Sequence, residues 1–301
     1  MLDYLSAAEL CLDAEKRGCT ISQLVLEDQA KQLELPPQEV FQRMERRLTV
    51  MEEAIKAGLN PDLRSTSGLT GGDAAKLYQY AGSGGITGSF LNRAMAYAVA
   101  VSEYNAAMGK VVAAPTAGSC GILPGTVVSL LTERRCERTS AVMALFTAGA
   151  FGMAIAQRAS IAGAEGGCQA ECGSASAMAA AAVVELMGGT PSQSAHACAI
   201  ALKNQMGLVC DPVAGLVEIP CIKRNVSGTV IAFSSAELAL AGVESKIPVD
   251  ECIQAMREVG ESMPCALRET AMGGLAVTPT GQRLKEQVFG GAVCQPRQQG
   301  T

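Results

Sequence analysis

Hydrophobic residues in the first sixty positions recur at intervals of three and four. The recurring positions are Leu24, Leu33, Val40, Met44, Leu48, Met51 and Ile55. This spacing places apolar side chains on one face of a helix and leaves the other face polar. The Pro36-Pro37 pair before the last five predicts a helix that starts there and ends at Gly58. Residues 1–60 are therefore expected to form an amphipathic helical layer.

From residue 61 the pattern changes to Gly-rich turns that separate Ala-rich segments. We expect turns at 65–76, 81–89, 114–125, 162–173 and 187–194, and helices at 89–109, 139–158, 174–187, 195–207, 227–242 and 249–263. The alternation of apolar and polar residues that is typical of strands is nearly absent. The sequence predicts an all-α fold, a compact bundle of buried Ala/Gly-rich helices, with residues 61–301 as one continuous domain.

Charged residues are distributed unevenly along the chain. Residues 1–60 hold 18 of them, whereas residues 141–220 hold seven. The most apolar run, 141–156, ends after sixteen residues at Gln157-Arg158, which is shorter than the roughly 20 residues that cross a bilayer. We expect this run to be a buried core helix. We do not expect the chain to associate with a membrane.

Composition narrows the class of protein further. The 301 residues are 49% hydrophobic and 18% charged, which is enough apolar material for a sizeable core. The net charge is −5, and the basic residues form no run longer than a pair, so nucleic acid is not an expected partner. The first residues, MLDYLSAAEL, lack the positive charge and apolar run of a signal peptide, and a cytoplasmic location is expected.

The twelve cysteines are numerous for a chain of this length. In a reducing compartment they stay free, bind metal or take part in chemistry. Cysteines in helical stretches are expected to be structural: Cys11, Cys19, Cys136, Cys198, Cys252 and Cys265. Cys168 and Cys172 instead lie in a Gly-rich expected turn, Cys210 follows a helix end and precedes Asp-Pro, and Cys221 follows Ile-Pro, positions that are typical of ligands. Without a CxxC pair, their spacing leaves both zinc and an iron–sulfur cluster open.

Two loops rich in hydroxyl groups are candidates for binding a carboxylate. Ser67 and Thr70 lie in the first loop, and Thr116 and Ser119 lie in the second. Hydroxyls and backbone amides at helix N-termini suit that task. His196 is the sole histidine, and its place on an Ala-rich helix is more typical of a structural residue than of a catalytic one.

Four segments together carry a resemblance to a known family. They read APTAGSCGILPG, GAEGGCQAECGSASAMAAAA, GLVCDPVAGLVEIPCIKRN and RETAMGGLA. Over most of residues 60–280 the chain resembles the iron–sulfur-dependent L-serine dehydratases, specifically the separate alpha chain of the two-subunit type. The resemblance implies elimination of water from L-serine to give pyruvate and ammonia. It also implies a [4Fe–4S] cluster bound by Cys168, Cys210 and Cys221, with the fourth iron free to act as a Lewis acid on the substrate hydroxyl.

The same resemblance implies a partner. The catalytic base of the family comes from the other subunit or domain, so an obligate beta subunit is expected and the base within this chain is unknown. Single-chain relatives place a cysteine near the C-terminus that can cap the open iron, a role that Cys294 could take here.

Polar residues near the expected ligands are candidates for supporting roles. Asp211, Arg224 and Asn225 flank two of the cysteines and could orient the thiolates, and Glu165 and Glu171 bracket Cys168 in the same way. A further candidate is Arg268, which could hold the substrate carboxylate through two hydrogen bonds.

Three other functions remain open from the residues. A pyridoxal-phosphate lyase could use Lys76 or Lys110 for a Schiff base. A non-catalytic subunit could use the thiols to bind structural zinc. A cluster enzyme that removes sulfide from L-cysteine is the nearest rival, because an open iron could also bind a thiol.

Overall fold

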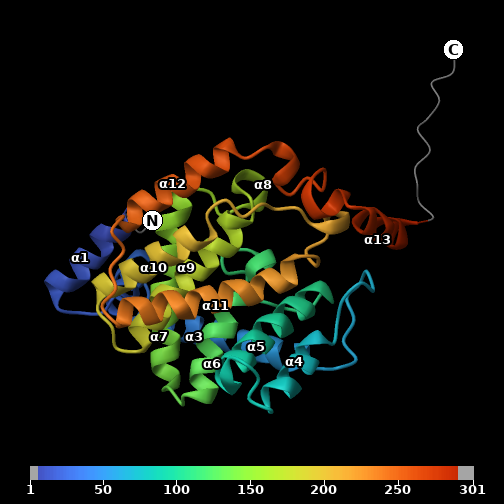
Figure 1. The fold of residues 1–301 in the computed structure, drawn as a ribbon. Helices are drawn as coiled ribbons and strands as arrows, with labels where there is room; N and C mark the ends of the chain where they lie inside the picture. Colours follow the sequence, from blue (N-terminus) through green and yellow to red (C-terminus); the bar gives the residue numbers. More distant parts are fainter. Residues whose placement is uncertain (1–5, 291–301) are drawn as a thin grey trace.

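The computed structural model describes residues 6–290, which fold almost wholly into helices (Figure 1). The α-helices are α1 (Ala7–Arg17), α2 (Ile21–Leu33), α3 (Pro37–Gly58), α4 (Asp73–Ala81), α5 (Gly88–Ala106), α6 (Ile122–Glu133), α7 (Arg138–Arg158), α8 (Gly163–Gly166), α9 (Ser174–Leu186), α10 (Pro191–Gln205), α11 (Cys221–Leu240), α12 (Val249–Ser262) and α13 (Pro279–Phe289). Within residues 6–290 there is no β-strand, and one isolated β-bridge pairs Cys210 with Arg268. The predicted all-α class is confirmed.

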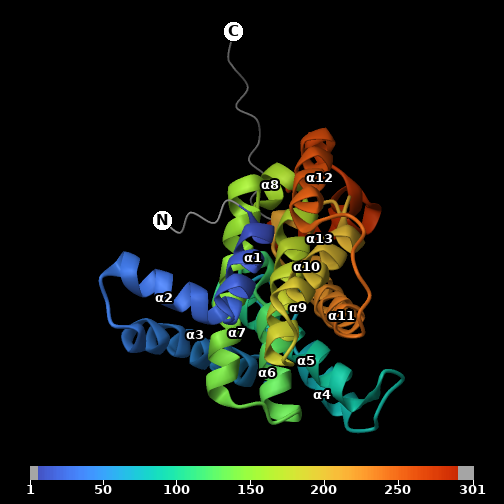
Figure 2. The ribbon, with the colours of Figure 1, turned by 90° about the vertical axis from the view of Figure 1, so that its left-hand side faces the viewer.

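Helices α1 to α3 cover one side of the bundle. Helix α3 spans Pro37–Gly58, as the sequence predicts. Helix α1 packs on α10, α2 on α7 and α3 on α5. Figure 2 shows α2 and α3 extending to one side of the remaining helices. The proposed division of the chain at residue 60 stays a prediction.

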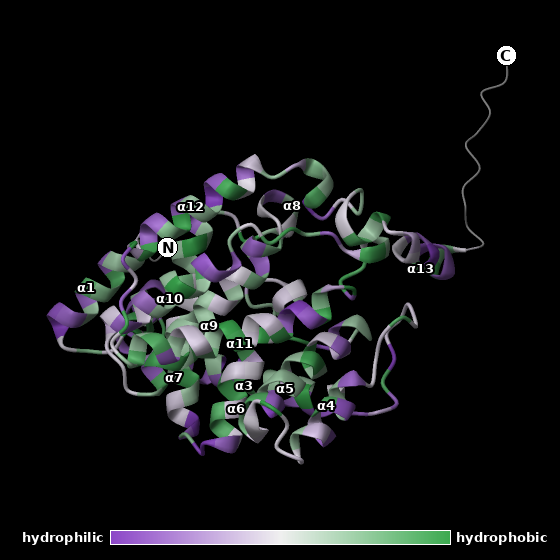
Figure 3. Cartoon of the chain, in the orientation of Figure 1, coloured by the Kyte–Doolittle hydropathy of each residue, from purple (hydrophilic) through white to green (hydrophobic). Residues whose placement is uncertain are grey.

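Helix α9 forms the centre of the bundle. It packs against α7, α10, α11 and α6, and eleven of its thirteen residues are buried. Most of these are Ala or Ser, whose small side chains let neighbouring helices approach closely. Figure 3 shows the apolar colouring concentrated on the inner helices and the polar colouring on outer ones such as α1 and α13. The core therefore contains few aromatic side chains and is packed by close contact between helix backbones.

Helix α7 contains the most apolar run of the sequence. By length and composition it could cross a membrane, but 67% of its most apolar window is buried inside the protein. It packs against α9 on one side and α2 on another. Its place in the core agrees with the prediction of a buried helix.

Several helices differ from the prediction in their bounds or are not predicted at all. Helix α10 begins at Pro191, inside a predicted turn, because Thr190 and Gln193 form a capping box. Helix α11 begins at Cys221 rather than at residue 227, so this cysteine opens a helix instead of lying in a loop. Helix α6 has no counterpart in the prediction. Nine of its twelve residues are buried, and it lacks the polar face that would reveal a helical period.

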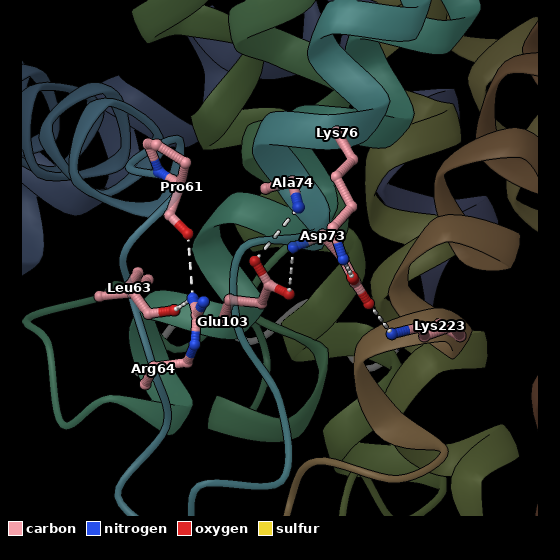
Figure 4. Close-up of polar contacts among 8 residues, drawn as sticks. All are labelled: Pro61, Leu63, Arg64, Asp73, Ala74, Lys76, Glu103 and Lys223. Atoms are coloured by element: carbon pink, nitrogen blue, oxygen red, sulfur yellow. Dashed lines mark hydrogen bonds and ion pairs between the residues drawn. The ribbon is translucent and has the colours of Figure 1, made fainter.

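The loop before α4 is tied to both α5 and α11 (Figure 4). The buried carboxylate of Glu103 accepts hydrogen bonds from the backbone amides of Asp73 and Ala74, at 3.1 and 3.2 Å, and so caps α4. Lys223, in the first turn of α11, pairs with Asp73 at 2.7 Å. In the preceding loop, Arg64 donates hydrogen bonds to the carbonyls of Pro61 and Leu63. The pair between Asp73 and Lys223 links the start of α4 to the first turn of α11, which carries Cys221.

Candidate functional site

Three buried thiols from separate segments lie within electrostatic range of one another. Cys168 directly precedes a π-helical turn, η2 (Gln169–Gly173), Cys210 follows the end of α10, and Cys221 is the first residue of α11. Their exposed fractions are 2%, 2% and 7%. The charge of Cys168 contributes to raising the pKa of both other thiols. These are the three cysteines that the resemblance implies as ligands, and their role as ligands stays a prediction.

The segment around residue 268 holds Cys210 in place. The amide of Cys210 donates to the carbonyl of Leu267 at 2.8 Å, and the amide of Glu269 donates to the carbonyl of Cys210 at 2.7 Å. This pairing forms the isolated β-bridge between Cys210 and Arg268. The RETAMGG segment is therefore attached by its backbone to one of the candidate ligands.

The thiols differ in how readily they ionise. Burial raises the pKa of Cys221 to about 12 and also raises the pKa of Cys210. The pKa of Cys168 is lowered, first by its hydrogen bond with Cys172, whose sulfur lies 3.4 Å away, and further by the nearby Arg224 guanidinium. Cys168 is the thiol of the three that most easily becomes the thiolate that metals bind.

Arg224 and Asp211 form a buried ion pair beside the thiols. The two groups lie 2.8 Å apart, and their side chains are 15% and 4% exposed. Arg224 also donates to the carbonyl of Val209 at 2.7 Å, while Asp211 accepts from the amide of Leu275 at 2.8 Å. The pair therefore fixes the backbone on both sides of Cys210.

Asn225 links the start of α11 to the glycine loop at 114–121. Its side-chain amide donates to the carbonyls of Gly118 and Cys221, at 2.8 and 2.9 Å, and its side-chain oxygen accepts from the amide of Gly121 at 2.8 Å. The side chain is fully buried and uses both of its polar ends. This arrangement suits the supporting role that the sequence suggests for Asn225.

The four hydroxyl candidates separate into two groups. Thr116 donates to the carboxylate of Glu171 at 2.9 Å, and the buried Ser119 lies 3.2 Å from Thr116. Thr70 donates to Glu218 at 2.6 Å, in the loop between two of the cysteines. Ser67 accepts from the amide of Leu69 within its own turn. Thr116 and Ser119 therefore lie beside Glu171, three residues after Cys168. Ser67 and Thr70 form no hydrogen bond with Glu171: Ser67 bonds within its own turn, and Thr70 bonds to Glu218.

The guanidinium of Arg268 has hydrogen-bond donors that are not all paired. One terminal nitrogen lies 3.4 Å from the carbonyl of Glu165, at the start of the cysteine-bearing turn. Its Nε is buried without a hydrogen-bond partner. A buried guanidinium donor without an acceptor is suited to a ligand carboxylate.

The other candidates from the sequence lie in ordinary structural contacts or outside the described residues. His196 accepts a hydrogen bond from the amide of Ser245 at 3.2 Å through its Nδ1, a structural contact. Lys76 is 77% exposed and pairs with Asp73 within one turn of α4, which does not favour a Schiff-base role. Lys110 lies with three arginines along an open surface hollow. Cys294 lies outside the described residues.

Thiolate sulfur is the donor that iron–sulfur clusters take from proteins, so the chemistry of Cys168, Cys210 and Cys221 fits such a cluster. Between residues 6 and 290, no three His, Cys, Asp or Glu side chains converge on one ion position. A structural zinc ion needs its ligand atoms about 2.0–2.3 Å away, whereas a four-iron cluster holds its thiolates further apart. A Cβ added to Gly163 would lie 3.1 Å from the Cys210 sulfur and 2.9 Å from Glu171, so this glycine keeps the space beside them open.

The contact of Cys172 with Cys168 is not predicted by the sequence pattern. The two are four residues apart, and such residues share a face once the segment is helical. The segment was expected to be a turn because four glycines lie within residues 163–173. Recognising a helical turn there would have placed the two thiols side by side.

Comparisons with known proteins identify the family of this chain. A family model described as "Serine dehydratase alpha chain" matches residues 16–276. A probable L-serine dehydratase alpha chain of Bacillus subtilis is 50% identical over 291 residues, covering 96% of this chain and 97% of the relative. The L-serine dehydratase alpha chain of Peptoniphilus asaccharolyticus is 48% identical over 281 residues, covering 93% and 96%.

A longer relative also matches. L-serine dehydratase TdcG of Escherichia coli is 38% identical over 283 residues, which are 91% of this chain but 62% of the relative. The longer protein therefore contains a further region that has no counterpart in the matched part. Because the family model matches most of its length, this chain belongs to the serine dehydratase alpha-chain family.

Proposed function

We propose that this chain is the alpha subunit of an L-serine dehydratase, which converts L-serine to pyruvate and ammonia. The observation that supports the proposal is that Cys168, Cys210 and Cys221, buried and from three segments, lie within electrostatic range of one another. The names of the most similar relatives described above support the choice of substrate. Loss of the Cα proton and of the β-hydroxyl gives aminoacrylate, whose tautomer, an imine, is hydrolysed by water to the two products.

We propose a [4Fe–4S] cluster as the cofactor, held by these three thiolates. When bound, it would supply a Lewis acid that makes the substrate hydroxyl a better leaving group. Arg224 favours the thiolate form of Cys168, and its ion pair with Asp211 holds the Cys210 segment in position. The free Nε of Arg268 is proposed to receive the substrate carboxylate, because the hydroxyls of Thr116 and Ser119 already bond to Glu171 and to each other.

We also propose a beta subunit that contributes the catalytic base, and a cytoplasmic location. The partner is supported by the name "alpha chain" of the relatives and by the additional region of the longer Escherichia coli protein. It is also supported by His196, the sole histidine, whose Nδ1 is occupied by a backbone amide. The isolated chain is then expected to carry the cluster without efficient turnover.

The test is reconstitution under anaerobic conditions. The alpha chain, the beta chain and their mixture are supplied with L-serine, and pyruvate is measured. The account predicts pyruvate from the mixture and little from either chain alone. Full activity of the alpha chain alone would contradict the need for a partner, and no pyruvate from the mixture would contradict the proposed reaction.

The same preparation separates the rival functions. Broad brown absorbance that is bleached by air indicates a cluster, a sharper yellow band indicates pyridoxal phosphate, and colourless protein indicates zinc or no cofactor. Faster sulfide release from L-cysteine than pyruvate formation from L-serine would favour the desulfidase alternative.

A further inference from the structure

Glu171 is a carboxylate in the thiol site that lacks a cationic partner. It lies in the π-helical turn η2, three residues after Cys168, and its side chain is half-buried. Its one hydrogen bond among the described side chains comes from the Thr116 hydroxyl, at 2.9 Å, and no ion pair to it occurs between residues 6 and 290. By contrast, Asp211 has the Arg224 guanidinium and a backbone amide as donors.

The surroundings of Glu171 add negative charge and withdraw water. Burial is the main cause that raises the pKa of its carboxyl, and the charge of Glu269 acts in the same direction. The carboxylate in turn contributes to raising the pKa of Cys210 and Cys221. A carboxylate removed from water without a positive partner is costly, so this position favours binding of a cation.

The backbones of two glycines lie close to the carboxylate of Glu171. A Cβ added to Gly118 would lie 3.2 and 3.3 Å from its two oxygens, and a Cβ added to Gly163 would lie 2.9 Å from one of them. The backbones of the hydroxyl loop and of the cysteine-bearing segment therefore approach Glu171 without a side chain between.

We propose that Glu171 binds the α-ammonium group of the substrate and so selects an α-amino acid over an uncharged analogue. This inference rests on the proposed function, whose substrate carries one ammonium, one carboxylate and one β-hydroxyl. The ammonium forms a charge-assisted hydrogen bond with the carboxylate, while Thr116 keeps the carboxylate oriented. The role is substrate recognition at the α-carbon, distinct from the contacts proposed for the carboxylate and the hydroxyl.

The experiment compares two ligands that differ in the ammonium group. L-serine and 3-hydroxypropanoate share the carboxylate and the β-hydroxyl, and only L-serine has the ammonium. With the reconstituted alpha–beta complex under anaerobic conditions, the KM of L-serine and the inhibition constant of 3-hydroxypropanoate are measured in the wild type and in Glu171→Gln, which keeps the side-chain shape. The variant is expected to bind L-serine about 10- to 100-fold more weakly and 3-hydroxypropanoate within about threefold of the wild type.

Glu218→Gln is the matched control. Glu218 is also a buried carboxylate held by one threonine hydroxyl, Thr70, in the loop between Cys210 and Cys221. Its replacement is expected to leave the ratio of the two affinities unchanged. A change of that ratio in Glu218→Gln and not in Glu171→Gln would overturn the assignment.

The outcomes separate this inference from the proposed function. Pyruvate formation by the wild type together with unaltered L-serine binding by Glu171→Gln overturns the inference alone, and so does a loss of turnover without weaker L-serine binding. Absence of pyruvate from the wild type instead contradicts the proposed function. If Glu171→Gln loses its iron, Glu171→Asp replaces it, and weaker binding of L-serine alone is again the expected result.

Discussion

At the residue scale, the site depends on buried polar groups that form hydrogen bonds and ion pairs with one another. The ion pair of Asp211 with Arg224 fixes the Cys210 segment, and Asn225 uses both ends of its amide to join two loops. The residue types and their positions beside the cysteines could be recognised in the sequence. Their partners could not, because Leu275 and Gly118 reach these side chains through backbone groups, which no sequence pattern marks.

Replacement of Asp211 by Asn should be strongly destabilising. It leaves the buried Arg224 charge without its partner, and breaking a buried pair from one side costs about 3–5 kcal/mol. Asp73→Asn is the control, since Asp73 pairs with Lys223 at the surface, and exposed pairs contribute about 1 kcal/mol or less. Urea unfolding of the two variants measures the difference, and equal losses would contradict the importance of the buried pair.

At the element scale, helix ends decide which residues reach the site. The helix from Pro37 to Gly58 and the core helices α5, α7 and α9 follow directly from sequence periodicity and Ala content. The start of α11 at Cys221 does not, because Pro220 and the preceding loop resemble a simple turn. The N-terminus of α1 likewise depends on a distant residue, Asp250 of α12, which accepts hydrogen bonds from Ser6, Ala7 and Ala8.

Asp250→Asn should lower stability in a way that depends on pH. Burial raises the pKa of Asp250, but hydrogen bonds from Ser6, from two amides and from Arg158 outweigh it and lower the pKa below 3.8. The stabilisation is therefore present above about pH 4 and is lost as the pH falls through the lower, folded-state pKa. At pH 7 the variant is expected to lose about 1–2 kcal/mol, and the difference should shrink towards pH 3.

Thermal unfolding from about pH 3 to pH 7 checks this expectation. Glu251→Gln is the control, since Glu251 is the exposed neighbour of Asp250 on α12. A stability difference for Asp250→Asn that does not change with pH would show that its carboxylate charge is unimportant.

At the scale of the whole molecule, small residues let the helices pack closely around α9. Composition predicts this general arrangement, since Trp is absent and Gly and Ala are abundant. It does not predict which glycines lie at contacts. Gly58, at the end of α3, faces the backbone of Ala100 in α5, whereas a Cβ on Gly149 in α7 would have nothing within 4 Å.

These two glycines give a matched pair of variants. Gly58→Ala places a methyl group against backbone that cannot move aside, and a loss of about 2–3 kcal/mol is expected. Gly149→Ala removes a helix-interior glycine without a clash and should be neutral or stabilising by up to about 1 kcal/mol. Denaturant unfolding compares them, and a harmless Gly58→Ala would contradict the close packing of α3 on α5.

The central claim is that thiols from three segments hold one iron–sulfur cluster. The most direct measurement is the iron and acid-labile sulfide content of the anaerobically purified protein and of Cys168→Ala, Cys210→Ala, Cys221→Ala and Cys172→Ala. The account predicts about four irons and four sulfides in the wild type, a large loss in the first three variants, and retention in Cys172→Ala. Full iron content in any of the first three variants, or a comparable loss in Cys172→Ala, would contradict it.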